Sequence, residues 1–238
     1  MSRAAERATP RHVLVFDLDD TLYLERDYVA SGFRALGAWV SDNLGARDFA
    51  ERAWRCFEGG ARGRIFDTVL ADLGLGDRPE LIQTLLSLYR AHKPDIRLAP
   101  DARAWLERIG PDVGVALLTD GFLAAQRNKI EALGLAERPI RPIVCTDMWG
   151  RACWKPHDRG FLHIESHYRL PARAFTYVAD NPAKDFVAPL RLGWSTVWIR
   201  RPARIHADAR PCPGGCPDRM IESLDELAED RLVRSARG

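Results

Sequence analysis

The chain has 238 residues, enough for one sizeable hydrophobic core and a second, smaller one. Its 35 lysine and arginine residues nearly balance 33 acidic residues, and the formal net charge of +2 argues against a dedicated nucleic-acid-binding protein. The charged N-terminal stretch MSRAAERATPRH lacks the apolar centre of a signal peptide, and no later stretch is long and apolar enough to cross a membrane. The five cysteines do not suggest a secreted disulfide framework, so we expect a cytoplasmic protein.

The first predicted element is a strand from Val13 to Phe16, and it is followed at once by Asp17, Asp19 and Asp20. Carboxylates this close repel one another, so another group must offset their charge. In an open parallel sheet, ligands bind at the carboxyl ends of the strands. This acidic cluster is therefore the first candidate for a functional site.

The next interval, from about Glu25 to Pro94, contains no convincing strand. It consists of amphipathic helical stretches such as VASGFRALGAWVSDNL, DFAERAWRCF and ELIQTLLSLYRAH, which are broken by EGGARGR and LGLGDRP. We predict that residues 25–94 form a small helical domain inserted into a core made of residues 1–24 and 95–238.

The remainder of the chain alternates between short apolar runs and helix-length segments. The predicted strands are Val113 to Leu118, Ile143 to Cys145, Phe175 to Val178 and Thr196 to Ile199. The segments DARAWLERIG, FLAAQRNKIEALGL and AKDFVAPLRLG carry apolar stripes at helical spacing and end near glycine. This order predicts an α/β fold with a doubly wound parallel sheet.

Several of these strands lead directly into polar residues. TDG follows Leu118, ADNPAKD follows Val178, and WKPH follows the third strand after a short loop. Because the carboxyl ends of parallel strands share one edge of the sheet, six side chains are expected to converge: those of Asp17, Asp19, Thr119, Lys155, Asp180 and Asp185. One lysine cannot balance so many acids, so we expect a divalent cation as a partner.

These residues resemble, in order, the four motifs of the haloacid dehalogenase superfamily: Asp17-x-Asp19-x-Thr21, Thr119, Lys155, and Asp180 with Asp185. The resemblance spans nearly the whole chain. An insertion between the first two motifs is typical of members with a helical cap, and LLTDG, KIEALGL and YVADNPAKDFVAPLRLGWSTVWI resemble phosphatase-like members of that group. The resemblance implies a Rossmann-like core with an α-helical cap at residues 25–94.

The resemblance also implies a reaction. A Mg2+-dependent phosphatase would hydrolyse a small phosphomonoester metabolite, a sugar phosphate or a nucleotide, through an aspartyl-phosphate. Asp17 would be the nucleophile, and Asp19 would protonate the leaving oxygen and later accept a proton from water. The Asp17 carboxylate, the Asp19 backbone carbonyl and Asp180 would hold Mg2+.

The remaining motif residues would bind or support the phosphoryl group. The Thr119 hydroxyl and the backbone amides of Asp120 and Gly121 suit phosphate oxygens, and Lys155 supplies a positive charge. Asp185 would orient Lys155 or a metal-bound water. Asp120 and Ala179 depart from the usual pattern, where asparagine and glycine are frequent, but neither change removes a catalytic group.

Several alternatives remain open at this point. A phosphomutase differs only in passing the phosphoryl group from Asp17 to a second hydroxyl, and an inactive relative would only bind a phosphorylated ligand or partner. Dehalogenases of the superfamily lack an acid at the position of Asp19, and receiver-type signalling modules place their phosphorylated aspartate after the third strand. Both of these readings are therefore disfavoured.

Other polar residues carry weaker signals. Cys212 and Cys216 in CPGGC could hold a metal, although no second pair of matching spacing exists, and His157 and His163 fit helix-surface or core positions better than ligand positions. In the loop EGGARGRIF, Arg62 and Arg64 could contact the leaving group of the substrate, or the loop could simply be solvated. The oligomeric state is left open.

Overall fold

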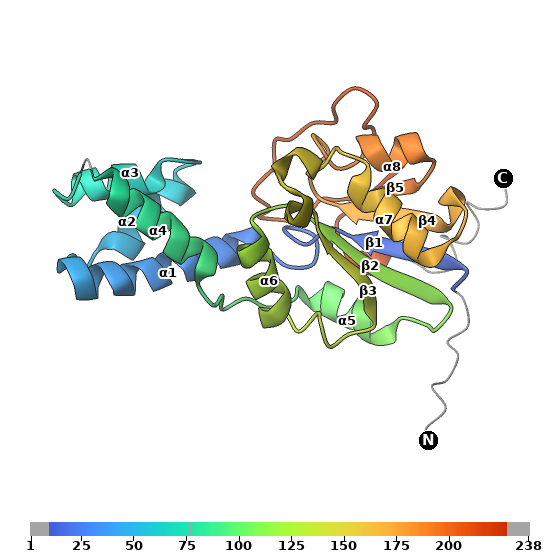
Figure 1. Cartoon of the computed structure of the whole chain (residues 1–238), viewed down its shortest axis with the longest axis horizontal. Coiled ribbons are helices and arrows are strands. Elements are labelled where there is room, and N and C mark those ends of the chain that lie inside the picture. The colour runs from blue at the N-terminus through green and yellow to red at the C-terminus, as the bar shows by residue number, and fades with distance from the viewer. Residues whose placement is uncertain (1–9, 77, 228–238) are drawn as a thin grey trace, which may run out of the picture.

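The computed structural model describes residues 10–76 and 78–227, so most of the N-terminal stretch considered above lies outside the described residues. The described chain forms an α/β part and a separate group of helices beside it (Figure 1). The α/β part is built on one sheet with the strand order β3-β2-β1-β4-β5-β6, in which every neighbouring pair is parallel. The strands are β1 (His12–Phe16), β2 (Val113–Thr119), β3 (Ile140–Cys145), β4 (Phe175–Ala179), β5 (Ser195–Ile199) and β6 (Arg219–Ile221).

Helices cover both faces of this sheet because successive side chains of a strand point to opposite faces. Leu14 and Phe16 of β1 belong to the apolar cluster that includes residues of α5 and α6, whereas Val13 and Val15 belong to the cluster on α7 and α8. These helices are α5 (Pro100–Arg108), α6 (Leu123–Ala132), α7 (Arg159–Tyr168) and α8 (Val187–Leu192), and short 3-10 turns lie at Thr146–Trp149, Arg151–Cys153, Ala172–Ala174 and Leu224–Glu226.

The observed sheet confirms the predicted α/β fold class. The sixth strand, β6, was not predicted, and the prediction of β3 began three residues late. The three residues of β6 read Arg-Met-Ile, and Met220 is 57% exposed, so no apolar run identifies this edge strand from sequence.

Four helices lie between β1 and α5: α1 (Glu25–Leu44), α2 (Phe49–Glu58), α3 (Ile65–Asp72) and α4 (Pro79–Ala91). They enclose an apolar cluster of their own, which includes Phe33, Phe49 and Leu85. We call residues 25–94 the helical insertion. Its exact limits as a domain remain a prediction, but the described helices all fall within them.

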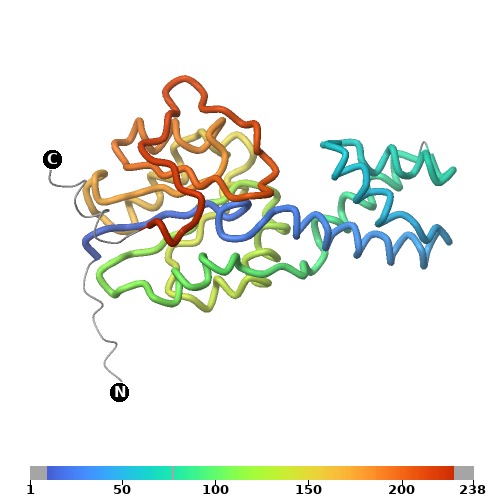
Figure 2. Tube along the Cα trace, turned by 180° about the vertical axis from the view of Figure 1, so that it is seen from behind, coloured from blue at the N-terminus to red at the C-terminus, as the bar shows by residue number. Residues whose placement is uncertain are grey.

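The helical insertion meets the α/β part along α4 and α6 and along the loop after β5. Asn128 of α6 donates to the carbonyl oxygens of Ala91 and His92, and Ile205 packs against the apolar cluster of the insertion. Figure 2 shows the same two bodies from behind, with the chain crossing between them at the start of α1 and after α4. The carboxyl edge of the sheet therefore faces the insertion.

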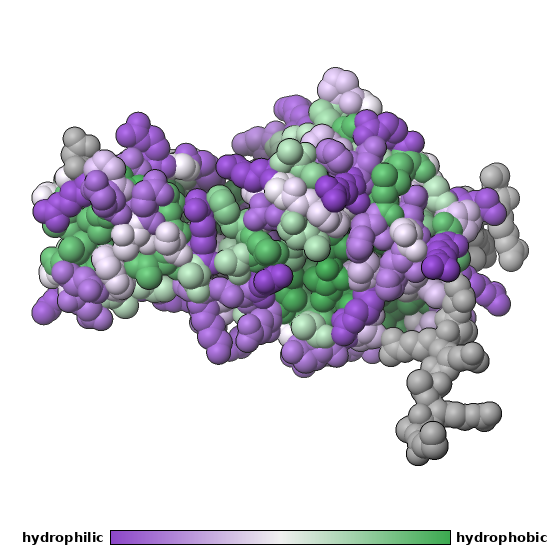
Figure 3. All heavy atoms as spheres, in the orientation of Figure 1, coloured by the Kyte–Doolittle hydropathy of each residue, from purple (hydrophilic) through white to green (hydrophobic). Residues whose placement is uncertain are grey.

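The visible surface carries many hydrophilic residues over both bodies, and hydrophobic residues gather between α6 and β3 (Figure 3). Among the residues that the structure describes, no helix combines the length and hydrophobicity that a membrane crossing requires.

Candidate active site

The strand ends bring the predicted site residues together. Asp17 follows β1, Thr119 ends β2 and Asp180 follows β4, and the backbone amide of Asp17 donates to the carbonyl of Val178. The side chains are deeply buried: Asp17 is 5% exposed, Thr119 1% and Asp180 4%. The β1–β4 pairing thus fixes the two aspartates at one edge of the sheet.

Lys155 is the centre of the charge arrangement. Its ammonium nitrogen lies 2.7 Å from Oδ1 of Asp17, 2.8 Å from Oδ1 of Asp185 and 2.8 Å from the hydroxyl of Tyr177. Burial alone would lower the pKa of Lys155, but the charges of Asp17 and Asp185 raise this pKa well above its ordinary value. Lys155 is therefore a fixed cation beside the predicted nucleophile, and Tyr177 is a partner that sequence reasoning missed.

The carboxylates of Asp17, Asp180 and Asp185 lie close enough to share one cation, with ligand atoms within 4.8 Å of one another. Oδ2 of Asp180 is buried and has no hydrogen-bond partner. Burial, reinforced by the charges of Asp185 and Asp17, raises the pKa of Asp180 well above its ordinary value. Burial likewise raises the pKa of Asp17 to about 6, although Lys155 opposes the change. An oxygen-rich, unbalanced acidic group of this kind fits a hard divalent cation such as Mg2+.

Asp19 points away from this group and is held by the α/β part. Lys129 contacts both carboxylate oxygens at 2.7 and 2.9 Å, Gln126 donates at 3.2 Å, and the Tyr23 hydroxyl donates to Oδ1. Burial raises the pKa of Asp19, but the charge of Lys129 and these hydrogen bonds outweigh it, so the pKa is lowered overall. The structure thus presents Asp19 as an ionised carboxylate.

Gln126 and Lys129 were not predicted as site residues. They lie three positions apart on α6 and therefore share one face of the helix, which follows the second motif directly. Their spacing could have suggested that both face the site, but many helices carry such pairs on their solvated side.

Asp20, the third aspartate after β1, binds backbone amides rather than side chains of the site. Asp20 accepts hydrogen bonds from the backbone amides of Glu25 at 2.9 Å and Ile205 at 2.6 Å. Its backbone φ is +50°, and burial raises its pKa to about 6. Asp20 therefore ties the start of α1 to the loop after β5, and the repulsion expected from the sequence is relieved because the three carboxylates point to three different sets of partners.

The predicted phosphate-binding residues lie at the end of β2. The Asp120 side chain accepts from the Thr146 hydroxyl at 2.7 Å and from the Lys155 backbone amide at 3.2 Å, and it forms an ion pair with Lys184 at 3.3 Å. Burial raises the pKa of Asp120, but Lys155 and Lys184 lower it overall. The negative charge of Asp120, which departs from the usual motif, is thus balanced by Lys155 and Lys184. Gly121 has a φ of +121°, where a side chain would be strained.

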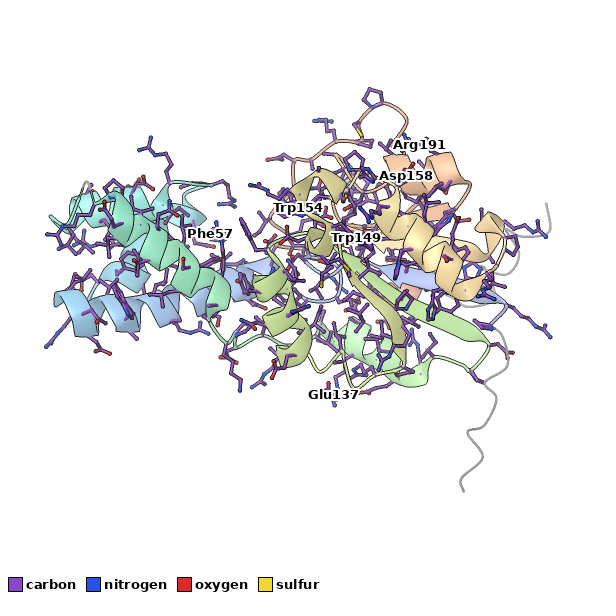
Figure 4. All side chains as sticks on the ribbon, in the orientation of Figure 1. Phe57, Glu137, Trp149, Trp154, Asp158 and Arg191 are labelled. Atoms are coloured by element: carbon purple, nitrogen blue, oxygen red, sulfur yellow. The ribbon has the colours of Figure 1, made fainter. Side chains whose placement is uncertain are left out.

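A cavity of about 360 Å³, the active-site cavity, opens above these residues. Its floor includes Asp17, Asp19 and Asp180, and its walls come from both bodies, with Tyr28 and Tyr89 from the helical insertion. Trp154 also lines it, and Figure 4 places this side chain on the side of the α/β part that faces the insertion. A small molecule held there would touch both bodies.

Arg62 and Arg64 do not line the active-site cavity but a neighbouring one. Arg62 donates to the backbone carbonyls of Phe57 and Ala61, both at 2.8 Å, and Arg64 forms an ion pair with Asp67. Contact of Arg62 or Arg64 with the leaving group of the substrate therefore stays a prediction.

The other polar candidates stay apart from the site. Cys212 and Cys216 are free thiols, and in the part of the chain that the structure describes only Asp17, Asp180 and Asp185 form a group that could hold a metal ion. His157 and His163 are exposed, and the ring of His163 packs edge-on against Trp149, which Figure 4 labels.

No family model matches the chain. It is 29% identical over 197 residues to a glyceraldehyde 3-phosphate phosphatase of Methanocaldococcus jannaschii, a match that covers 78% of this chain and 83% of that protein.

Two solved structures have the same fold at low identity. The putative hydrolase YfnB of Bacillus subtilis, bound to magnesium, is 20% identical with a TM-score of 0.63, covering 92% of this chain and 97% of that one. A 2-haloacid dehalogenase from Pseudomonas syringae is 20% identical with a TM-score of 0.60, covering 94% and 98%.

Proposed function

We propose that the chain is a hydrolase of the haloacid dehalogenase superfamily and, within that group, a Mg2+-dependent phosphatase. In this proposal it hydrolyses a small phosphomonoester metabolite through an aspartyl-phosphate at Asp17. The similarity to a protein named as a glyceraldehyde 3-phosphate phosphatase supports a small phosphorylated substrate. The helical insertion acts as the cap that covers this substrate.

One observation carries the proposal: Asp17 lies between a buried lysine and a buried carboxylate that lacks a partner. Lys155 contacts Asp17 at 2.7 Å, and Oδ2 of Asp180 has no hydrogen bond. A bound Mg2+ would be held by Asp17 and Asp180 with the Asp19 backbone carbonyl, and it would neutralise charge on the phosphoryl group. Asp185, paired with Lys155, orients that lysine.

The chain's own residues would carry the two chemical steps. A carboxylate oxygen of Asp17 attacks phosphorus, the bond from phosphorus to the ester oxygen breaks, and the leaving oxygen receives a proton from Asp19. Water then attacks the phosphoryl group on Asp17 and gives its proton to Asp19. The bond from phosphorus to the Asp17 oxygen breaks, which releases inorganic phosphate and restores the Asp17 carboxylate. Throughout, Lys155, the Thr119 hydroxyl and the amides of Asp120 and Gly121 bind the phosphoryl oxygens.

The pairing of Asp19 with Lys129 bears on both steps. It favours the ionised carboxylate, which is the form that accepts a proton from the attacking water. For the first step Asp19 must carry a proton, and the ion pair with Lys129 disfavours that protonated form. An acid at this position also distinguishes the proposal from dehalogenation, because a departing halide needs no proton.

The proposal is tested by measuring phosphate release from p-nitrophenyl phosphate and from a panel of phosphorylated metabolites. We expect release that requires Mg2+ and stops in excess chelator, because the acidic group would otherwise repel the substrate. Full activity in chelator would contradict the proposal. A phosphomutase would instead convert a sugar phosphate to its isomer without net release of phosphate, and chromatography of the same reactions detects that product.

The five free thiols support a reducing, cytoplasmic location as part of the same proposal.

A further inference from the structure

A second cavity, of about 430 Å³, lies between the helical insertion and the loop after β5, which contributes Ile205 and His206. We call it the insertion cavity. Four aromatic side chains line it, those of Phe33, Phe57, Phe66 and Tyr89, together with aliphatic side chains of α1, α3 and α4. The apolar side chains that face this space favour contact with an apolar group of a ligand over contact with water.

The insertion cavity adjoins the active-site cavity. The two share Glu25, Leu86, Tyr89 and His206 as lining residues. Glu25 begins α1, directly after the segment that carries Asp17 and Asp19, and His206 belongs to the loop after β5. A molecule whose phosphoryl group lies at Asp17 would reach the insertion cavity by passing these four side chains.

The two cavities differ in the polarity of their lining residues, and this difference indicates which kind of ligand fits them. Near Asp17 the groups are charged and polar, and at the junction Glu25 and His206 offer hydrogen bonds. Farther in, aromatic rings line the cavity beside the charged side chains of Arg62, Arg64 and Asp67. Phe33 meets Phe57 and Phe66 edge-to-face there, with ring centroids 6.4 and 6.2 Å apart. A ligand that fits this order is anionic at one end, polar in the middle and apolar at the far end.

Aromatic lining favours a flat ring as the apolar end. Ring edges and faces pair with one another at low cost in conformational freedom, because a ring has few rotatable bonds. The guanidinium of Arg62 lies over the Phe57 ring at 4.2 Å, so the protein itself covers one face of Phe57. Figure 4 labels Phe57 on the part of the insertion nearest the α/β part.

We propose that the insertion cavity is the subsite for an aromatic ring of the leaving group, so that the substrate is a phosphomonoester whose alcohol carries a flat aromatic ring through a short polar spacer. This inference rests on the proposed function and narrows it. A sugar phosphate without an aromatic ring would fill only the active-site cavity. A nucleoside monophosphate has all three parts in the required order.

Binding of non-hydrolysable analogues tests the subsite directly. Isothermal titration calorimetry with Mg2+ compares 3-phenylpropylphosphonate with propylphosphonate, which lacks only the ring. We expect the ring to tighten binding by about tenfold or more, since it removes apolar surface from water. Equal affinities overturn the subsite, whatever is found for hydrolysis.

Hydrolysis provides the second measurement. The kcat/KM of adenosine and uridine 5′-monophosphate is compared with that of ribose 5-phosphate, which lacks the base, and 2-phenylethyl phosphate is compared with ethyl phosphate. A ring-bearing ester should be preferred by about tenfold in at least one comparison. If no ester is hydrolysed while the phenyl phosphonate still binds more tightly, the proposed function fails and the subsite stands.

Cavity-filling variants locate the ring. Ile82 and Leu81 are adjacent, half-buried residues of α4 that both pack against the apolar cluster of the insertion, but only Ile82 lines the cavity. Ile82→Trp should abolish the preference for the phenyl phosphonate, and the matched Leu81→Trp should keep it. Ile65→Trp, which fills the same cavity from α3, provides a second variant if Ile82→Trp is destabilised. A preference that persists in both filled variants with unchanged melting temperatures overturns the assignment.

Discussion

The ammonium group of Lys129 lies 2.7 Å from Oδ1 and 2.9 Å from Oδ2 of Asp19, and its side chain is only 4% exposed. The Lys129 nitrogen also lies 4.2 Å from the centre of the Tyr28 ring, which comes from the helical insertion. Lys129 therefore connects the proposed acid and base with the wall of the active-site cavity. Its two contacts hold the Asp19 carboxylate in one orientation. The position two residues after Asp17 does not fix that orientation by itself.

We predict that Lys129→Met lowers kcat by about 10- to 100-fold for an alkyl phosphate, because Asp19 loses the partner that positions it for proton transfer. The loss should be smaller for p-nitrophenyl phosphate, whose leaving group needs little protonation. Arg127→Met removes one exposed charge from the same helix and is the matched control. Equal losses on both substrates would contradict a role of Lys129 in protonation of the leaving group, because the second step, with Asp19 as the base, is common to both substrates.

A second prediction separates Asp180 from Asp185. Asp180→Ala removes a buried oxygen that has neither a hydrogen bond nor an ion pair, whereas Asp185→Ala removes an ion-pair partner of Lys155. The first change should raise the Mg2+ concentration for half-maximal activity by more than the roughly tenfold expected for a supporting residue. Mg2+ titrations of both variants provide the measurement. Identical shifts would contradict the division of roles.

A third prediction concerns stability and pH, away from the site. His12 is 5% exposed, and its Nε2 lies 2.9 Å from the hydroxyl of Thr176. Burial lowers the pKa of His12 from 6.5 to about 4. Between these two pH values the unfolded chain binds a proton at His12 that the folded protein does not. The contribution of His12 to the free energy of unfolding is therefore fully present above pH 6.5 and is lost as the pH drops toward 4.

The lowered pKa of His12 makes the free energy of unfolding about 3 kcal/mol higher above pH 6.5 than below pH 4. His12→Gln keeps a hydrogen-bonding side chain but does not titrate, so its stability should decline less between pH 7 and pH 4.5. Urea unfolding at both values measures the difference. His163→Gln changes an exposed histidine and should leave the pH dependence of the wild type intact; the same steep decline in His12→Gln would show that another group causes it.

The fold class could be predicted from sequence because the buried strands are nearly continuous apolar runs. Val13 to Phe16 and Phe175 to Val178 are buried on both faces of the sheet, so their composition alone marks them as central parallel strands. The edge strand β6 has a single buried residue, Ile221, and offers no such pattern. Its position depends on pairing with β5, a contact that no local pattern reveals.

The positions of the site residues could be anticipated because the polar residues follow the strands directly. The direction of each side chain could not. Asp17, Asp19 and Asp20 look alike in the sequence, yet they face Lys155, Lys129 and two backbone amides. These partners lie more than a hundred residues away in three of the four contacts, so only the folded chain assigns each carboxylate its surroundings.

The central claim is that Asp17 carries the phosphoryl group, and trapping the intermediate tests it most directly. The protein is mixed with Mg2+ and an activated aryl phosphate, quenched in acid, digested and analysed by mass spectrometry. We predict a phosphoryl group on the peptide that contains Asp17, and none in Asp17→Asn, whose folded state is checked by circular dichroism. Phosphate release at a near-normal rate by Asp17→Asn, or a phosphoryl group on another residue of the wild type, would contradict the account.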